Sequence, residues 1–195
     1  RGEKGVLVVQ PPLPPGCLLT VWGDDSRFVK SYFSSFKDLL YTSSDWAVCD
    51  EDGYFFILGR TDDVINVAGH RLGTREIEEA IQSHSAIAEV AVVGMADKVK
   101  GQVPIGFARL KDPTQLDAAG AAAKLEKEII NKVQELLGAV AKPHSVHFVS
   151  SLPKTRSGKL LRRSIQALAE GRDPGDLSTL DDPNSLEEVR RAVEH

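Results

Sequence analysis

The chain has 195 residues, enough for one full hydrophobic core or for one domain and part of another. Its hydrophobic share of 42% and charged share of 27% are ordinary for a globular protein in water. A net charge of −4 excludes a global basic field for nucleic acid, and no apolar run approaches the ~20 residues that span a bilayer. We therefore expect neither a nucleic-acid nor a membrane partner.

The two cysteines, Cys17 and Cys49, lie 32 positions apart without metal-ligand spacing. This usage predicts small buried thiols in a reducing compartment. The chain does not open with methionine and shows no signal peptide, so we interpret it as a piece of a longer protein.

The first sixty residues favour β-structure. An Asp-Glu-Asp-Gly turn at 50–53 predicts a hairpin, because Asp and Gly accept the backbone angles of a tight loop. A short helix over Arg27–Phe36 would carry Phe28, Tyr32 and Phe33. The expected strands are Val6–Val9, Leu39–Thr42, Trp46–Cys49 and Tyr54–Leu58.

After position 63, strands alternate with helices, which predicts a compact α+β domain. Thr74 is expected to cap a helix with Glu76 and Glu78 in its first turns, where the helix dipole favours anions. Its apolar face would consist of Ile77, Ala80 and Ile81. A helix over Ala121–Leu137 would bury the stripe Leu125, Ile129, Val133 and Leu136. The remaining elements are strands at Val64–Val67, Val90–Val93, Ile105–Leu110 and Val146–Val149, and helices at Leu160–Ala169 and Leu186–Val193.

The composition changes at Thr61–Asp63, a polar junction typical of a linker. This places a domain boundary between residues 61 and 62. An exposed turn inside a single domain is the alternative.

The segment Ser150–Lys159 combines three cations, Lys154, Arg156 and Lys159, with a small-residue turn. Gly158 allows backbone conformations closed to other residues, so the lysine after it can move. Its ammonium is a compact point charge suited to a carboxylate or phosphate oxygen. Taken alone, the segment could equally be a solvated basic loop.

Three separated motifs resemble the acyl-CoA synthetases of the AMP-forming adenylating superfamily, over nearly the whole chain. The residues of the second and third motifs given below are similar to those of the short-chain acetyl/propionyl branch, and residues 170–183 are similar to propionyl-CoA synthetases. The motifs are Gly53-Tyr54…Gly59-Arg60-Thr61-Asp62-Asp63-Val64-Ile65, Gly69-His70-Arg71-Leu72-Gly73-Thr74…Glu76-Ile77-Glu78 and Leu152-Pro153-Lys154-Thr155-Arg156-Ser157-Gly158-Lys159.

The resemblance implies that residues 1–61 are the β-rich end of a large N-terminal AMP-binding domain and that residues 62–195 are a small, mobile C-terminal lid. It implies a ligase that uses ATP, Mg²⁺ and CoA to convert a short-chain carboxylate, with propionate favoured and acetate next, to an acyl-adenylate and then an acyl-CoA. The fragment alone would be inactive, because its partner is the missing N-terminal domain of the same enzyme. A bacterial cytoplasm or the mitochondrial matrix is the implied location.

The same resemblance implies roles for single residues. Lys159 is similar to the catalytic lysine of the first half-reaction, and its acetylation would remove the charge. Asp45 resembles the carboxylate that binds the ribose hydroxyls, Arg60 the arginine that reaches the ribose, and Arg71 the one that meets the phosphates. For the arginines, surface ion pairs with Asp62, Asp63 or Glu76 are the alternative.

Three further positions carry weaker implications. Asp62 occupies the family's hinge position. Ala68 and Gly69 resemble the segment beside the pantetheine channel, although a plain strand-ending glycine fits as well. His84 lies where relatives show a cation contact, and a solvated helix end is the alternative. One position departs from the family, because Gln134 stands where short-chain relatives carry an arginine for the CoA phosphate; Lys132 or Lys142 could substitute.

Two other functions remain open. An adenylating domain that loads a different acceptor, or a luciferase, shares the fold and the lysine. The second alternative is a binding protein rather than an enzyme, namely a basic module for nucleic acid. No aromatic residue lies between its cations, however, and single-strand binding normally requires such residues for stacking. Its patch would be Lys154, Arg156, Lys159, Arg162 and Arg163.

Overall fold

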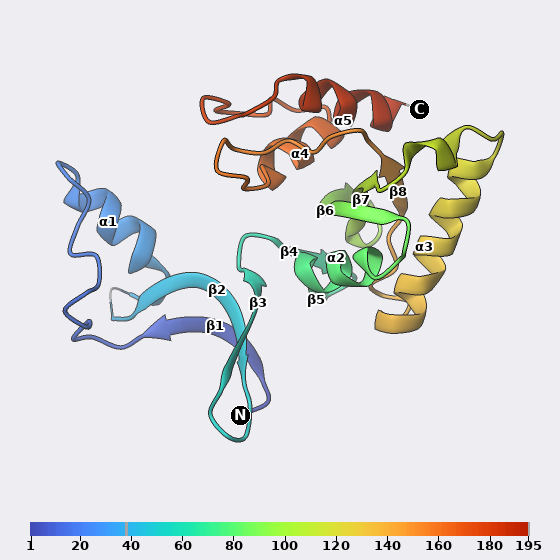
Figure 1. Cartoon of the computed structure of the whole chain (residues 1–195). Coiled ribbons are helices and arrows are strands. Elements are labelled where there is room, and N and C mark those ends of the chain that lie inside the picture. The colour runs from blue at the N-terminus through green and yellow to red at the C-terminus, as the bar shows by residue number, and fades with distance from the viewer. Residues whose placement is uncertain (38, 195) are drawn as a thin grey trace. The chain divides into compact units, whose positions relative to one another are not determined.

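The structure is a computed structural model that describes residues 1–37 and 39–194 (Figure 1). Contacts divide it into two compact units, Arg1–Asp62 and Asp63–His195, which we call unit 1 and unit 2. The division falls one residue after the boundary expected from the sequence, within the polar junction at 61–63. The two units are described separately.

Unit 1 contains a three-stranded antiparallel sheet in the order β1-β2-β3, formed by β1 (Lys4–Val9), β2 (Tyr41–Cys49) and β3 (Phe55–Arg60). The predicted hairpin between the last two strands is confirmed. Asp50 closes the turn, since its carboxylate accepts from the Tyr54 amide at 2.8 Å. Gly53 adopts a φ of 95°, a conformation that favours glycine.

The prediction of two short strands at Leu39–Thr42 and Trp46–Cys49 is wrong, because β2 is one continuous strand and Leu39 lies outside it. The polar residues between them suggested a break. They remain in the strand because β2 is the central strand and pairs with a neighbour on each side. Ser44 bends the strand locally with a φ of 61°.

The predicted helix Arg27–Phe36 starts earlier and is split in two, as α1 (Asp25–Tyr32) and the 3-10 turn η1 (Ser34–Phe36). The Asp24 side chain caps α1 by accepting from the Arg27 amide at 2.9 Å. The hydrogen bond from the Ser26 hydroxyl and then that from the Arg27 amide lower the Asp24 pKa. The predicted aromatic residues do cluster here, with Tyr32 stacked on Tyr41 at 5.1 Å between ring centroids.

Unit 2 is built on one sheet in the order β5-β4-β7-β6, with β8 parallel to β7. Its elements are β4 (Val64–Val67), β5 (His70–Gly73), α2 (Thr74–Gln82), β6 (Ile87–Asp97), β7 (Gly101–Leu110), η2 (Pro113–Leu116), α3 (Ala121–Leu137), β8 (Ser145–Phe148), α4 (Arg162–Ala169) and α5 (Asn184–Glu194). The bounds of β4 and α3 agree with the sequence prediction, whereas β5 was not predicted.

Helices cover both faces of this sheet. Val90 and Val92 of β6 point into a core formed with α2 and α3. Their neighbours Ala91 and Val93 point to the opposite face, into a second core formed with α4 and α5. An apolar run without alternation is the pattern of a strand buried on both sides. The expected α+β class is confirmed, and in Figure 1 α4 and α5 lie together on the second face.

Several local predictions are corrected. Thr74 does not cap α2; Gly73 is the N-cap without a side-chain bond, and Thr74 is the first helical residue, 4% exposed. Leu136 does not belong to the buried stripe of α3, because it is 57% exposed. Cys17 and Cys49 are free thiols, yet only half-buried. Within the described residues, no helix combines the length and apolarity needed to cross a membrane.

Glu78 of α2 is buried, at 8% exposure. Its carboxylate binds Arg162 at the start of α4 through two hydrogen bonds, at 3.0 Å to Nε and 2.8 Å to Nη2. It also accepts from the Val92 amide at 2.9 Å, so it joins α2, β6 and α4. Burial alone would lower the Arg162 pKa, but the hydrogen bonds and charge of Glu78, with the nearby Asp63, raise it.

Arg162→Met should therefore lower the free energy of unfolding of the chain by about 3 kcal/mol, because it leaves the Glu78 carboxylate buried without its cation. Urea unfolding followed by far-UV circular dichroism measures this loss. The control is Arg75→Met, which breaks the exposed pair with Glu79 on the same helix and should cost less than about 1 kcal/mol. Equal losses in the two variants would contradict the structural role of the buried pair.

The His147 ring on β8 is half-buried, stacked on Phe107 at 5.4 Å between centroids, and its Nε2 lies 3.0 Å from Ser145 Oγ. Burial lowers the His147 pKa, so the folded state binds its proton less readily than the unfolded chain. Stability from this residue is present above the unfolded pKa of about 6.5 and is lost as the pH falls below that value.

We expect the unfolding free energy of the wild-type chain to decline between pH 7.5 and pH 5.5, and His147→Gln to flatten that decline. Denaturant unfolding at a series of pH values measures both profiles, with the exposed His70→Gln as control. An unchanged slope in His147→Gln would refute this assignment.

Candidate functional site

Lys159 lies at the exposed end of a hydrogen-bonded turn in unit 2. The Thr155 amide donates to the Lys159 carbonyl at 2.8 Å, and the Gly158 amide donates to the Thr155 carbonyl at 2.8 Å. The Thr155 hydroxyl in turn accepts from the Lys159 amide at 3.1 Å. Gly158 has a φ of 83°, and a Cβ there would touch nothing within 4 Å, so glycine is needed for its conformation alone. The backbone at Lys159 is fixed, while its side chain extends into solvent.

The base of the turn is fixed to the sheet. Lys154 forms an ion pair with Glu89 of β6, which also lies 3.8 Å from Arg109 of β7. Behind the turn, the Leu161 amide donates to the Pro153 carbonyl at 3.0 Å, and Arg162 holds Glu78. Two of the five cations in the predicted basic patch are thus neutralised by the fold. For Lys159 itself, no carboxylate of the described residues lies within ion-pair distance, which leaves its charge available for a ligand.

Asp45 and Arg60 face each other across β2 and β3, where they are paired in the antiparallel register. Arg60 also holds Asp62 two residues later, with Nε 3.1 Å from Oδ1. Thr61 is tied to β2 because its amide donates to the Ser44 carbonyl at 2.9 Å. The structure therefore brings three of the predicted residues together at the end of unit 1. The Arg60–Asp62 pair is exposed, so a ligand can displace it at a cost of about 0–1 kcal/mol.

Ala68 and Gly69 form the two-residue turn between β4 and β5. Both have positive φ, 49° and 87°, which is the signature of a type I′ hairpin turn. The Ala68 amide donates to the Lys100 carbonyl at 2.8 Å, and this bond helps to hold a conformation that costs a non-glycine residue about 1–2 kcal/mol. Gly69 therefore has a conformational reason to be present. Arg71 lies next to the turn on β5 and is exposed.

The end of α2 carries His84, whose Nε2 lies 3.9 Å from Glu128 Oε2 on α3. Lys132 caps the same helix end, since its ammonium donates to the Ser83 carbonyl at 2.7 Å. Lys132 is thus engaged by the fold, whereas Gln134 and Lys142 are exposed. Across residues 1–37 and 39–194, no group of three or more His, Cys, Asp or Glu side chains is arranged to hold a metal ion.

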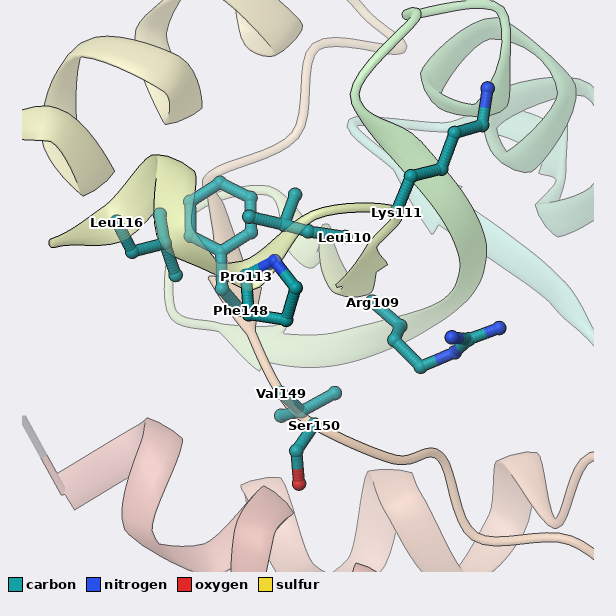
Figure 2. Close-up of a pocket in the computed structure, with 8 residues that line it drawn as sticks. All are labelled: Arg109, Leu110, Lys111, Pro113, Leu116, Phe148, Val149 and Ser150. Atoms are coloured by element: carbon teal, nitrogen blue, oxygen red, sulfur yellow. The ribbon is translucent and has the colours of Figure 1, made fainter.

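A cavity of about 280 Å³ in unit 2 is lined by none of the residues to which the sequence analysis assigned a catalytic or binding role. Figure 2 shows Leu110, Pro113, Leu116 and Phe148 gathered at its apolar side, while Arg109 and Lys111 extend away from them. The cavity is therefore lined mainly by apolar side chains, and the charged ends of Arg109 and Lys111 lie away from them. It does not extend the site described above.

Sequence reasoning identified Lys159 but missed the residues that hold it. Thr155 lies within the quoted motif but received no role there, and Glu89 stands 65 positions before Lys154, so no local pattern reveals its contact. The segment Thr179–Asp181 pairs with the turn, but its sequence is mostly polar and gives no strand pattern. Only its single apolar residue, Leu180, could have indicated burial.

Comparison with known proteins agrees with this arrangement. The family model described as "AMP-binding enzyme C-terminal domain" matches residues 76–159, ending on Lys159. The chain is 60% identical to a propionate--CoA ligase of Escherichia coli over 98% of its length, and 48% identical to an acetyl-coenzyme A synthetase of Pyrobaculum aerophilum over 99%. It spans only 31% and 28% of the length of these two relatives.

A solved structure, the acetoacetyl-CoA synthetase from Streptomyces lividans, superposes with a TM-score of 0.82 at 25% identity, over 99% of this chain and 28% of that one. Its similarity extends over both units, and the sequence match covers the turn that presents the exposed lysine. Residues 76–159 therefore carry the match to the AMP-binding enzyme C-terminal domain, and the match to the two relatives named above extends over nearly the whole chain.

Proposed function

We propose that this chain is the C-terminal part of an ATP-dependent, AMP-forming acyl-CoA ligase for a short-chain carboxylate. In the first half-reaction a carboxylate oxygen attacks the α-phosphorus of ATP, and pyrophosphate leaves as the acyl-adenylate forms. In the second, the CoA thiol attacks the acyl carbon, AMP leaves, and the thiol proton passes to solvent. Propionate is favoured and acetate is next, following the names of the two relatives above.

The observation that carries the proposal is the exposed Lys159 on a fixed turn, in a sequence 60% identical to a propionate--CoA ligase. An ammonium without a partner carboxylate can meet the oxygen atoms where negative charge develops during the attack on phosphorus. Unit 1 would be the β-rich end of the nucleotide-binding domain, and unit 2 would be the lid that delivers the lysine.

In unit 1, Asp45 would accept hydrogen bonds from the ribose hydroxyls, since an ionised carboxylate can hold a diol with its two oxygens. Arg60 would release Asp62 and reach toward the same ribose. In unit 2, Arg71 would meet phosphate oxygens, which suit a planar guanidinium. The type I′ turn at Ala68 and Gly69 would line the passage for the pantetheine arm of CoA, because Gly69 has no side chain to obstruct it.

The divalent cation enters this proposal as the Mg²⁺ that accompanies ATP. His84 has one carboxylate neighbour, Glu128, so the described residues offer it only a weak cation contact. Acetylation of Lys159 would abolish its charge and thereby regulate the first half-reaction. The relative with 60% identity comes from Escherichia coli, so we place the parent enzyme in a bacterial cytoplasm rather than in the mitochondrial matrix.

Asp62 is proposed as the hinge at which unit 2 changes orientation between the half-reactions, because it stands at the division between the units. A hinge residue must be free to change its backbone angles. The exposed ion pair with Arg60 is weak enough to break during such a change.

Lys159→Ala in the full-length parent should slow adenylate formation about 10²–10³-fold, the usual effect of removing one charge-stabilising group. Thioester formation from supplied propionyl-adenylate should be unchanged. Propionate-dependent pyrophosphate exchange and CoA thioester release measure the two steps, and the exposed Lys111→Ala is the control. An equal loss in both steps would contradict the assignment of Lys159 to the first half-reaction.

Asp62→Pro in the full-length parent should preserve the melting temperature but impair switching, because proline fixes φ near −65°. Rapid-quench measurements should then show one half-reaction retained and the other slowed at least about tenfold. Asp62→Ala is the matched control, since it removes the same carboxylate and leaves the backbone free. Equal slowing of both half-reactions would count against a hinge.

The alternatives make different predictions for acceptor and ligand. An adenylating domain for another acceptor would support pyrophosphate exchange without CoA turnover. A basic nucleic-acid module would bind oligonucleotides in a salt-sensitive manner, but the ion pairs of Lys154 and Arg162 with Glu89 and Glu78 weigh against it. Assaying the full-length parent with acetate, propionate and butyrate, and measuring AMP release in the presence of CoA, separates these possibilities.

A further inference from the structure

The segment Arg172–Glu194, which we call the tail, lies outside the residues matched by the family model and packs against the rest of unit 2. Leu186 and Val189 of α5 are buried in the second core, at 9% and 0% exposure. The Ser164 hydroxyl donates to the Pro174 carbonyl at 2.9 Å, and the Ser150 amide donates to Glu188 at 3.2 Å. The tail is therefore anchored at both ends to the domain that carries Lys159.

Between these anchors, the tail pairs directly with the lysine turn. Thr155 and Leu180 form an antiparallel bridge. On one side of it the Arg156 amide donates to the Thr179 carbonyl at 3.1 Å, and on the other the Asp181 amide donates to the Lys154 carbonyl at 2.9 Å. Lys154 also bridges Leu160 on the opposite arm of the turn. The first arm of the turn is thus the middle of a small three-stranded ladder.

Leu180 makes this pairing more than a surface contact. Its side chain is 8% exposed. It lies in the same core as Ile165 of α4 and Val189 of α5. A backbone segment whose side chain is buried cannot detach without exposing apolar surface, so the ladder is held in place by the core. The turn would otherwise present a free backbone edge to solvent.

We propose that the tail is a positioning element for Lys159, in which Thr179–Asp181 brace the turn and fix the direction in which the lysine leaves the domain. This inference rests on the proposed function, since it adds a support to the residue that acts in the first half-reaction. Small displacements of a catalytic group can cost about 10²-fold in rate, which gives such a brace a measurable effect. The brace has no role in the second half-reaction.

The test uses two variants of Asp181 in the full-length parent. Asp181→Pro removes the amide that donates to Lys154, whereas Asp181→Ala removes only the exposed carboxylate and keeps that amide. We expect Asp181→Pro to lower kcat for propionate-dependent pyrophosphate exchange about 10–100-fold, with KM for ATP and propionate and the rate of thioester formation from supplied adenylate within twofold of wild type. Asp181→Ala should behave as wild type. Pyrophosphate exchange within twofold of wild type in Asp181→Pro would overturn the proposal.

A second pair of variants covers the possibility that proline disturbs folding. Leu180→Ala shortens a leucine buried in the second core and Leu177→Ala one that is partly buried against the same core, but only residue 180 bridges the turn. Hydrogen exchange of the 195-residue chain should accelerate at residues 154–160 in Leu180→Ala more than in Leu177→Ala, while residues 90–93 of β6 stay protected in both. Equal protection of the turn in the two variants would refute the brace.

These measurements distinguish failure of the brace from failure of the proposed function. If Lys159→Ala abolishes adenylate formation while the tail variants leave both activity and exchange unchanged, the brace is wrong and the proposed function stands. If Lys159→Ala leaves adenylate formation intact, the proposed function fails, whereas the exchange measurement still decides whether the tail fixes the turn.

Discussion

The ion pair of the half-buried Arg162 with the buried Glu78 is the interaction on which the rest of unit 2 depends. It joins α2, which follows the first hairpin of the unit, to α4, which follows the lysine turn, and Glu78 also binds the Val92 amide of the edge strand β6. The cores on the two faces of the sheet are otherwise separate. Because a buried charge is costly without its partner, this pair fixes where α4 begins and hence where the turn leaves the domain.

In the segment that ends at Lys159, the backbone is held in place while the lysine side chain is exposed to solvent. Its backbone is held by the Thr155 hydroxyl, by the ion pair of Lys154 with Glu89 and by the pairing with the tail. Its ammonium is left in solvent. This is the division that electrostatic catalysis requires, because a charge whose base is already fixed needs little reorganisation when a reacting phosphate arrives. The exposed pair of Arg60 with Asp62 shows the opposite arrangement, in which a weak contact can yield.

The sequence predicts those elements that have a complete local signal. The helix Ala121–Leu137 repeats apolar residues at three and four positions and lies between two glycines, and its bounds were predicted correctly. The strand His70–Gly73 was missed because it contains one large apolar residue, Leu72, and forms only because the Ala68–Gly69 turn folds it back on β4. Continuous β2 was missed since its polar centre is stabilised by neighbours distant in the sequence.

The candidate site divides in the same way. Lys159 stands out because its motif is contiguous, while Glu78 and Arg162 are 84 positions apart, so no local pattern predicts that they pair. The bracing role of Thr179–Asp181 depends on backbone groups, which every residue has, so no side-chain pattern could have indicated it. Roles implied by resemblance for Asp45, Arg71 and His84 remain proposals about the parent enzyme.

The central claim is that unit 2 delivers Lys159 to the reacting phosphate in one state and withdraws it in another. A crystal structure of the full-length parent with a non-reactive propionyl-adenylate analogue, determined with and without CoA, tests it most directly. We expect the Lys159 ammonium within about 3.2 Å of an adenylate oxygen in at least one captured state. If position 159 stays in solvent, away from the nucleotide, in every state, the account is wrong.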